Sequence, residues 1–356
     1  MSIRHLYRLM AGMGLQRRIQ LTQPVNTVRA VINELRTPFQ NLGYRLMKRR
    51  LQQQYGVIAG YHTIRRILSV LDPEGVELRR SHRLRRRIYV NQGPNYAIHV
   101  DGWDKLKPFG ISVHAAADGF SRRVLWMKAA NSNKDPTSIC HFYIEYIRQI
   151  NQVPRLVCGD RGTENAHIRD AQRCLRNFHD DEMQGVNSFQ YFASTQNIII
   201  ERFWRQLKDG YGLFWINLMK DMVSYGIFDP TDEIHIEVIR FVFIPLIQNE
   251  LDKFSRLWNQ HRLRRVANVD RAAGKPDVLF YQPEVYGTVD YGLPVHIDLD
   301  RLAAAVGAKA PPEHGCCDEF AEAALTIMVN RGYNLPRSYE DGLRLFANLT
   351  DNLARY

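Results

Sequence analysis

Cysteine is scarce in this 356-residue chain, and long hydrophobic runs are missing. The five cysteines are odd in number and form no CxxC pair, which argues against a disulfide framework and favours a reducing compartment. The most apolar stretch, Val238–Ile247, contains Arg240 and Pro245 and is shorter than the ~18 residues that a membrane span needs. Since Met1–Gln20 also has no apolar signal core, we expect no secretion signal and no association with a membrane.

Positive charge is what the chain has in excess. The formal net charge is +11, while the hydrophobic content of 45% and the charged content of 24% are ordinary for a globular protein. Such an excess favours a polyanionic partner, with nucleic acid ahead of an anionic membrane, although a basic protein without a nucleic-acid role is the alternative. The length allows two or three domains of roughly 100–150 residues each.

Apolar residues recur at helical spacing through residues 1–75, which predicts helices over 2–15, 25–35, 42–55 and 61–71. A helix, a glycine-containing turn and a second helix with basic outward positions outline a helix-turn-helix, although a plain helical bundle gives the same periodicity. We interpret residues 1–75 as a helix-turn-helix-type DNA-binding region. The third predicted helix carries four basic residues that we expect to face outward: Arg45, Lys48, Arg49 and Arg50.

Arginine dominates the stretch that follows, which we interpret as a basic linker over residues 76–94. Runs of this kind contact nucleic-acid phosphates or direct nuclear import, and the alternative is a solvated linker. Nuclear import would place the protein in the nucleus, and without it the chain would stay in the cytoplasm. The candidate DNA-binding residues of the linker are Arg79, Arg80, Arg83, Arg85, Arg86 and Arg87.

From residue 95 the hydrophobic period changes. Three strands in a meander followed by alternating helices and strands predict a mixed sheet with helices packed on it. Further helical periodicity follows from residue 213 to the end of the chain. The predicted strands cover 96–100, 110–117, 121–128, 155–158 and 190–192, and the predicted helices cover 136–150, 166–177 and 197–208.

Three carboxylates stand out in this region. Asp101 and Asp160 each follow a short apolar run, and Glu201 lies on a predicted helix. Taken singly, each is more often a helix cap or an ion-pair partner. If the first and fourth strands are neighbours, the two aspartates meet at one sheet edge, and a cluster of three carboxylates is stable mainly when cations hold it. Such oxygen donors select Mg²⁺ or Mn²⁺, and no His/Cys set suggests zinc.

Four segments carry a resemblance to a known family: HVDGWDKL, ADGFSRRVLWMK, VCGDRGTEN and NIIIERFWRQLK, in this order. Together they resemble the catalytic core of retroviral-type integrases and D-D-E transposases, including integrase-core-domain proteins of animal genomes. Asp101 matches the first-strand Asp of that core, Asp160 its fourth-strand Asp, and Glu201 its helical Glu. The 40 residues between Asp160 and Glu201 are close to the usual spacing in the family, and WNQHR at 258–262 resembles a segment that follows such cores.

The resemblance implies a ribonuclease-H-like α/β fold over residues 95–265. A helix-turn-helix-type region would precede it, and a mainly helical region at 266–356 would follow. It also implies a polynucleotidyl transferase that processes DNA and transfers strands with two Mg²⁺ or Mn²⁺ ions held by Asp101, Asp160 and Glu201. Because such enzymes join two DNA ends, a homo-oligomer is expected. Many members carry an N-terminal zinc module, but no cysteine precedes Cys140, so we expect no zinc here.

Residues around Glu201 are candidates for DNA contact, namely Asn197, Arg205 and Lys208, with a solvated helix face as the alternative for the two basic ones. Asp104 is expected to be structural, because only Asp101 follows the apolar run directly. Two other functions stay open for the chain. It could be a host-retained integrase relative that binds DNA without catalysis, or a ribonuclease-H-like nuclease that cleaves without joining.

Overall fold

The computed structural model describes residues 5, 8–9, 12–13, 21–80, 91–192, 197–264 and 273–353. The chain forms two compact units, residues 1–83 and 84–356. Within the described ranges, no helix combines the length and the apolar character that crossing a bilayer requires.

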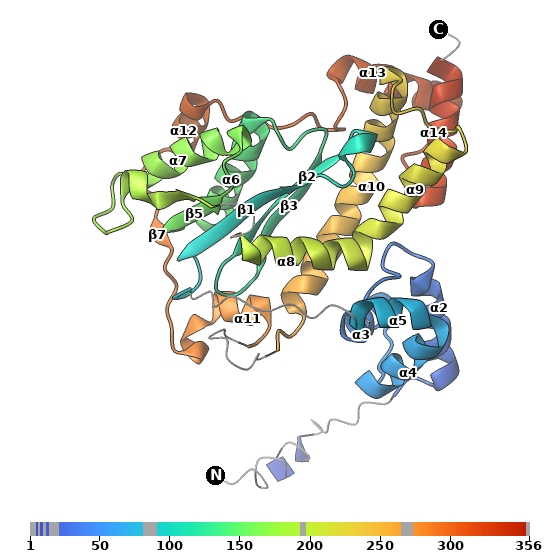
Figure 1. Ribbon diagram of the computed structural model, residues 1–356, viewed down its shortest axis with the longest axis horizontal. Coiled ribbons are helices and arrows are strands. Elements are labelled where there is room, and N and C mark those ends of the chain that lie inside the picture. The colour runs from blue at the N-terminus through green and yellow to red at the C-terminus, as the bar shows by residue number, and fades with distance from the viewer. Residues whose placement is uncertain are drawn as a thin grey trace. The chain divides into compact units, whose positions relative to one another are not determined.

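The first unit is built from short helices (Figure 1). Three of them, α2 (Pro24–Leu35), α3 (Tyr44–Tyr55) and α4 (Tyr61–Leu71), match the predicted helices closely and pack on one another. A further helix, α5 (Pro73–Arg80), extends into the stretch that we interpreted as a linker, so the basic segment begins as a helix. The helix predicted over residues 2–15 lies largely outside the described residues.

One basic residue of α3 differs from the expectation. Arg50 was predicted to face outward, but it is buried between α2 and α3, where its Nε lies 3.0 Å from a carboxylate oxygen of Glu34. Its guanidinium also stacks 4.0 Å from the ring centroid of Phe39. A buried charge requires such a partner, because its desolvation is otherwise uncompensated. The pair therefore fixes α3 against α2.

The second unit is organised around a five-stranded sheet in the order β3-β2-β1-β5-β6 (Figure 1). β1 (Ala97–Trp103), β2 (Ser112–Asp118) and β3 (Val124–Ala130) form an antiparallel meander. β5 (Leu156–Gly159) then runs parallel to β1, and β6 (Phe189–Tyr191) parallel to β5. This mixed sheet with flanking helices confirms the predicted ribonuclease-H-like fold.

The first strand is longer than predicted. The predicted strand covered residues 96–100, but β1 continues to Trp103, because Asp101 pairs with Ala115 of β2 and Trp103 with Val113. Gly102 leaves room for Asn133, because a Cβ at this position would come within 2.3 Å of the side-chain nitrogen of Asn133 and force that side chain to move. Asp101 therefore lies within a paired strand rather than at its end.

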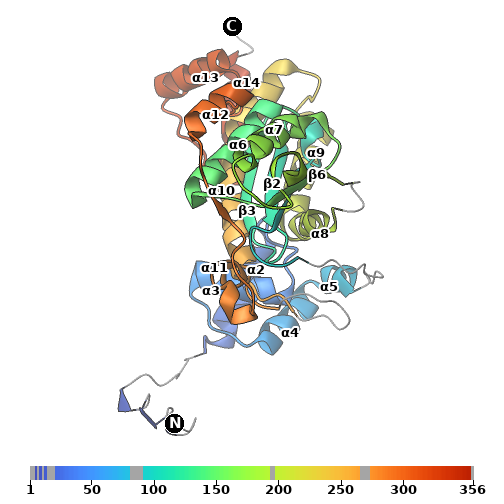
Figure 2. The same ribbon diagram turned by 90° about the vertical axis from the view of Figure 1, so that its left-hand side faces the viewer.

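The two faces of β1 meet different helices. Ile98 and Val100 belong to the hydrophobic core that includes side chains of α6 (Pro136–Ile150) and α7 (Ala166–Arg176). The alternate residues of β1 face α8 (Ile198–Leu207), which lies on the opposite side of the sheet (Figure 2). Because side chains alternate along a strand, every second residue of β1 from His99 is delivered to α8.

The remaining elements surround this sheet. α10 packs along β3 and α14, while α12 packs on α6 and α7. The predicted C-terminal helices are therefore present. The bounds are α9 (Leu213–Ser224), α10 (Glu233–Gln260), α11 (Pro276–Tyr281), α12 (Leu299–Val306), α13 (Asp318–Arg331) and α14 (Tyr339–Leu353), with a small sheet of β4 (Gln152–Val153) and β7 (Leu293–Pro294).

Side chains of α10 cover the open edge of β3. The Gln248 amide accepts from the Ala129 nitrogen at 2.8 Å and donates to the Met127 carbonyl at 3.0 Å. Three turns further on, Asn259 bonds both backbone groups of Val124, at 2.8 and 3.0 Å. Two carboxamides thus take the place of a neighbouring strand and satisfy edge groups that would otherwise attract another chain. Asn259 belongs to the WNQHR segment. Because its side chain bonds to the backbone of Val124, its role in the structure is to support the edge of β3.

Candidate active site

Asp101 occupies a half-buried position on β1, on the face that meets α8. One carboxylate oxygen accepts from the Gly102 backbone nitrogen at 2.9 Å, and the other accepts from the indole nitrogen of Trp204 at 2.8 Å. Trp204 belongs to α8, so a single hydrogen bond ties the carboxylate to the helix that carries Glu201. Both oxygens retain lone pairs for a further ligand.

Asp160 directly follows β5. Its Oδ1 accepts from the Gly162 nitrogen at 3.1 Å and from the Asn165 side chain at 2.8 Å, which fixes the carboxylate in the turn. The parallel register pairs His99 of β1 with Cys158 of β5. Asp101 and Asp160 each lie two residues beyond that pair, which is the last of the β1–β5 register, so both residues continue in the same direction from neighbouring positions.

Glu201 lies in the first turn of α8, and its side chain is exposed. The start of this helix is fixed by Asn197, which is buried and forms hydrogen bonds with both its amide oxygen and its amide nitrogen. Its oxygen lies 2.6 Å from Nδ1 of His99, and its nitrogen donates to the Val100 carbonyl at 3.2 Å. Because the amide nitrogen is a donor, the oxygen accepts, and neutral His99 carries its proton on Nδ1.

The far end of α8 is held by aromatic packing. Trp103 of β1 stacks on Trp204, with ring centroids 6.4 Å apart. After α8 the chain continues as a π-helical turn, Lys208–Gly212, and a Cβ at Gly212 would come within 2.5 Å of the Trp103 ring. π-helical turns occur frequently at functional sites. His99, Asp101 and Trp103 therefore each contact the α8 region, and together they fix where Glu201 emerges.

Asp101 responds electrostatically to the other two carboxylates. The pKa of Asp101 is raised to about 7, mainly by burial and further by the negative charges of Glu201 and Asp160. The hydrogen bonds from Trp204 and Gly102 act in the opposite direction, because they stabilise the charged form. The fold therefore brings Asp160 and Glu201 close enough to Asp101 for their charges to disfavour its ionised form.

Comparison with protein-family models supplies the identification. The model of the integrase core domain matches residues 88–281, more than half of the chain. The chain belongs to the integrase core domain family. A search of curated proteins found no match. The matched range includes the whole sheet and all three carboxylates of this integrase core.

The donors of the integrase core fit hard divalent cations in their chemistry. All three are carboxylates, and a cation would favour the charged form of Asp101, which burial and, to a smaller extent, the charges of Glu201 and Asp160 disfavour. Within the described ranges, no group of three or more His, Cys, Asp or Glu side chains is already gathered as a metal site. Glu201 is exposed, whereas the two aspartates are held by hydrogen bonds.

The candidate DNA-binding residues are placed in different ways. Arg205 and Lys208 are exposed on α8 and at the start of the π-helical turn. Asn197 is internal, with its amide bonded to β1, so the structure gives it a positioning role. Arg79 of the first unit lies 2.9 Å from Asp72. The Arg80 side chain, together with Arg83, Arg85, Arg86 and Arg87, lies outside the described residues.

The Asp104 side chain interacts with residues other than the three candidate carboxylates. It accepts from Asn133 at 2.6 Å and lies 3.6 Å from the Lys107 ammonium. The local sequence pattern did not predict the role of Trp204, whose indole donates to Asp101. Its position three residues after Glu201 was the available signal, because residues at this spacing share a helix face.

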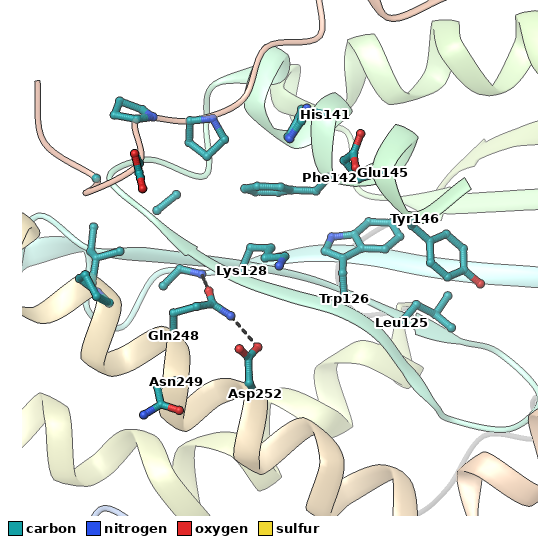
Figure 3. Close-up of a pocket in the computed structure, with 18 of the residues that line it drawn as sticks. Leu125, Trp126, Lys128, His141, Phe142, Glu145, Tyr146, Gln248, Asn249 and Asp252 are labelled. Carbon is teal, nitrogen blue, oxygen red and sulfur yellow. Dashed lines mark hydrogen bonds between the residues drawn. The ribbon is translucent and has the colours of Figure 1, made fainter. Parts of the chain in front are cut away.

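A groove with a volume of about 910 Å³ lies between β3, α6 and α10 (Figure 3). Trp126, Lys128 and Phe142 line it, and Gln248 bonds to Asp252 at its margin at 2.8 Å. None of the three carboxylates of the integrase core lines this groove. It is therefore separate from the candidate active site.

Proposed function

We propose that this protein processes DNA ends and transfers DNA strands by phosphoryl transfer at Asp101, Asp160 and Glu201. The observation that carries the proposal is the convergence of these carboxylates in an integrase core, where two of them raise the pKa of the third. Bound Mg²⁺ or Mn²⁺ would activate the attacking oxygen and stabilise the leaving oxygen in an in-line displacement. The three carboxylates would hold the ions, with Asp101 and Asp160 preset by their hydrogen bonds.

Other residues of the chain would position DNA. Exposed Arg205 and Lys208 lie on the same helix as Glu201 and carry charges suited to phosphate oxygens. The attacking group is water during end processing and a DNA 3′-hydroxyl during joining. The basic segment at 76–94 would add backbone contacts, and a homo-oligomer in the nucleus would supply one active site for each DNA end.

A strand-transfer assay on short duplexes tests this function. Wild-type protein with Mg²⁺ or Mn²⁺ is expected to yield joined products that disappear with Asp160→Asn. Asp104→Asn is the matched control, since Asp104 is a nearby carboxylate bonded to Asn133, and we expect it to keep joining activity. Binding without products would indicate a non-catalytic integrase relative, and nicking without joining a nuclease. Full joining by Asp160→Asn would contradict the assignment of the carboxylates.

A further inference from the structure

The first unit presents a surface of a single charge. Residues 44–71, which contain α3 and α4, hold six arginines or lysines and no Asp or Glu. Among the described residues, Arg50 is the only one of the six that pairs with a carboxylate. The other five leave a net positive charge on these two helices, so the occupant of this surface is expected to be a polyanion.

One face of α4 is exposed. Only Ile64 and Leu68 of this helix are buried. On the opposite side, exposed His62, Arg66 and Ser69 follow one another at i, i+4 and i+7, the spacing of a single helix face. All three side chains can form hydrogen bonds with base edges, and a bare α-helix fits the width of the DNA major groove.

The turn before α4 is fixed. α3 ends at Gly56 in the left-handed conformation with φ of 63°, and Val57 and Ala59 bury their side chains. Ile58 pairs with Thr22 through two hydrogen bonds, from its nitrogen to the Thr22 hydroxyl and from the Thr22 nitrogen to its carbonyl, both 2.9 Å. The helix is thus presented in one orientation, which recognition of a sequence requires.

α3 supplies charges next to this face. Arg45, Lys48 and Arg49 are half-exposed on α3, and the Lys48 ammonium lies 4.2 Å from the ring centroid of Tyr61, the first residue of α4. Basic side chains beside the start of a helix that enters the major groove can contact the phosphates on either side of that groove.

We infer that the first unit recognises a particular sequence of duplex DNA. His62, Arg66 and Ser69 of α4 face base edges in the major groove, and Arg45, Lys48 and Arg49 of α3 contact the flanking phosphates. This assigns the choice of DNA sequence to a surface that is separate from the carboxylates and goes beyond the proposed strand transfer.

Selection of duplexes from a random library by the full chain in EDTA tests the inference, because binding is then measured without cleavage. We expect enrichment of a motif. On that motif Arg66→Ala should lose about tenfold or more in affinity, with little change on a scrambled duplex. Arg66→Lys should also lose the preference for the motif over the scrambled duplex, since lysine keeps the charge but cannot form a bidentate hydrogen bond. Arg49→Ala should weaken both duplexes alike and reduce the salt dependence.

Val70→Ala is the matched control, since Val70 is 77% exposed on α4 but has no hydrogen-bonding group, and both affinities should stay unchanged. The inference is overturned if no motif is enriched, or if Arg66→Ala weakens the motif and the scrambled duplex equally. Asp160→Asn should select the same motif as wild type. A motif without strand transfer would therefore contradict the proposed function alone, and strand transfer without a motif would contradict this inference alone.

Discussion

At the scale of single residues, the candidate active site depends on one hydrogen bond between a strand and a helix. Trp204 donates to Asp101 at 2.8 Å and stacks on Trp103, so the same indole sets both the direction of the carboxylate and the position of α8. The bond favours the charged form of Asp101 against the effect of burial. Trp204 is thus a positioning residue, because it acts through Asp101.

Trp204→Phe removes the N–H donor and keeps most of the ring. Without that donor, the pKa of Asp101 should rise above about 7, so protons compete with Mn²⁺ at higher pH. We expect Mn²⁺ affinity to increase with pH through about 7 in the wild type, and through a higher pH in the variant. Titration of Mn²⁺ binding between pH 6 and 9 measures this. Phe203→Leu, which alters packing against α10 and against the Trp204 ring but removes no hydrogen bond to Asp101, should leave the pH dependence where it is.

His99 gives the folded state its own pH dependence. Burial lowers its pKa to about 4, so the unfolded chain binds more protons between pH 6.5 and 4, and stability falls as the pH decreases through that window. The contribution reaches about 3 kcal/mol at most. His99→Gln should flatten the decline of the urea midpoint between pH 7 and 5. Ile98→Val, a buried neighbour that does not titrate, should lower the midpoint by a similar amount at each pH; equal slopes for wild type and His99→Gln would refute the prediction.

The sequence pointed to the candidate carboxylates but not to the residues that hold them in position. Asp101, Asp160 and Glu201 could be found because each follows or lies on a strongly patterned element. The donor role of Trp204 and the internal role of Asn197 depend on how α8 lies against β1, which local pattern does not specify.

At the scale of elements, hydrophobic periodicity predicted the bounds of the helices well. The ends of the strands depend instead on pairing with neighbouring strands. α6 begins and ends where predicted, because its apolar positions and its flanking residues Asp135 and Asn151 are local signals. β1 runs past Gly102 because β2 offers partners there. The cover over β3 by Gln248 and Asn259 could not be predicted either, since the groups that it satisfies lie more than 100 residues away in sequence.

Asn259→Ala tests that cover. It leaves the buried nitrogen and carbonyl of Val124 without their partner, and we expect a loss of roughly 1–3 kcal/mol in the free energy of unfolding. Urea unfolding followed by tryptophan fluorescence measures the change. Asn249→Ala, on an exposed position of the same helix, should change stability by less than about 0.5 kcal/mol. Similar losses for both variants would show that the edge contacts are not what stabilises β3.

At the scale of the whole molecule, the two units can be followed separately. All five tryptophans, from Trp103 to Trp258, lie in the unit formed by residues 84–356. Tryptophan fluorescence therefore reports the integrase core alone, whereas far-UV circular dichroism reports helices of both units. This separation allows effects of cations on the carboxylates to be distinguished from effects on the helices of the first unit.

Removing one carboxylate should stabilise the metal-free protein and weaken its response to cations. Glu201 raises the pKa of Asp101 by repulsion, so Glu201→Gln relieves strain between charges and should raise the free energy of unfolding at pH 8 by less than ~1 kcal/mol. Millimolar Mn²⁺ should raise the unfolding temperature of wild type, since a ligand that binds only the folded state stabilises it. The variant should respond much less.

Glu284→Gln, at an exposed carboxylate outside the site, should behave like wild type in both respects. Thermal unfolding by tryptophan fluorescence with and without Mn²⁺ decides the matter: an undiminished cation response in Glu201→Gln would show that Glu201 is not a ligand.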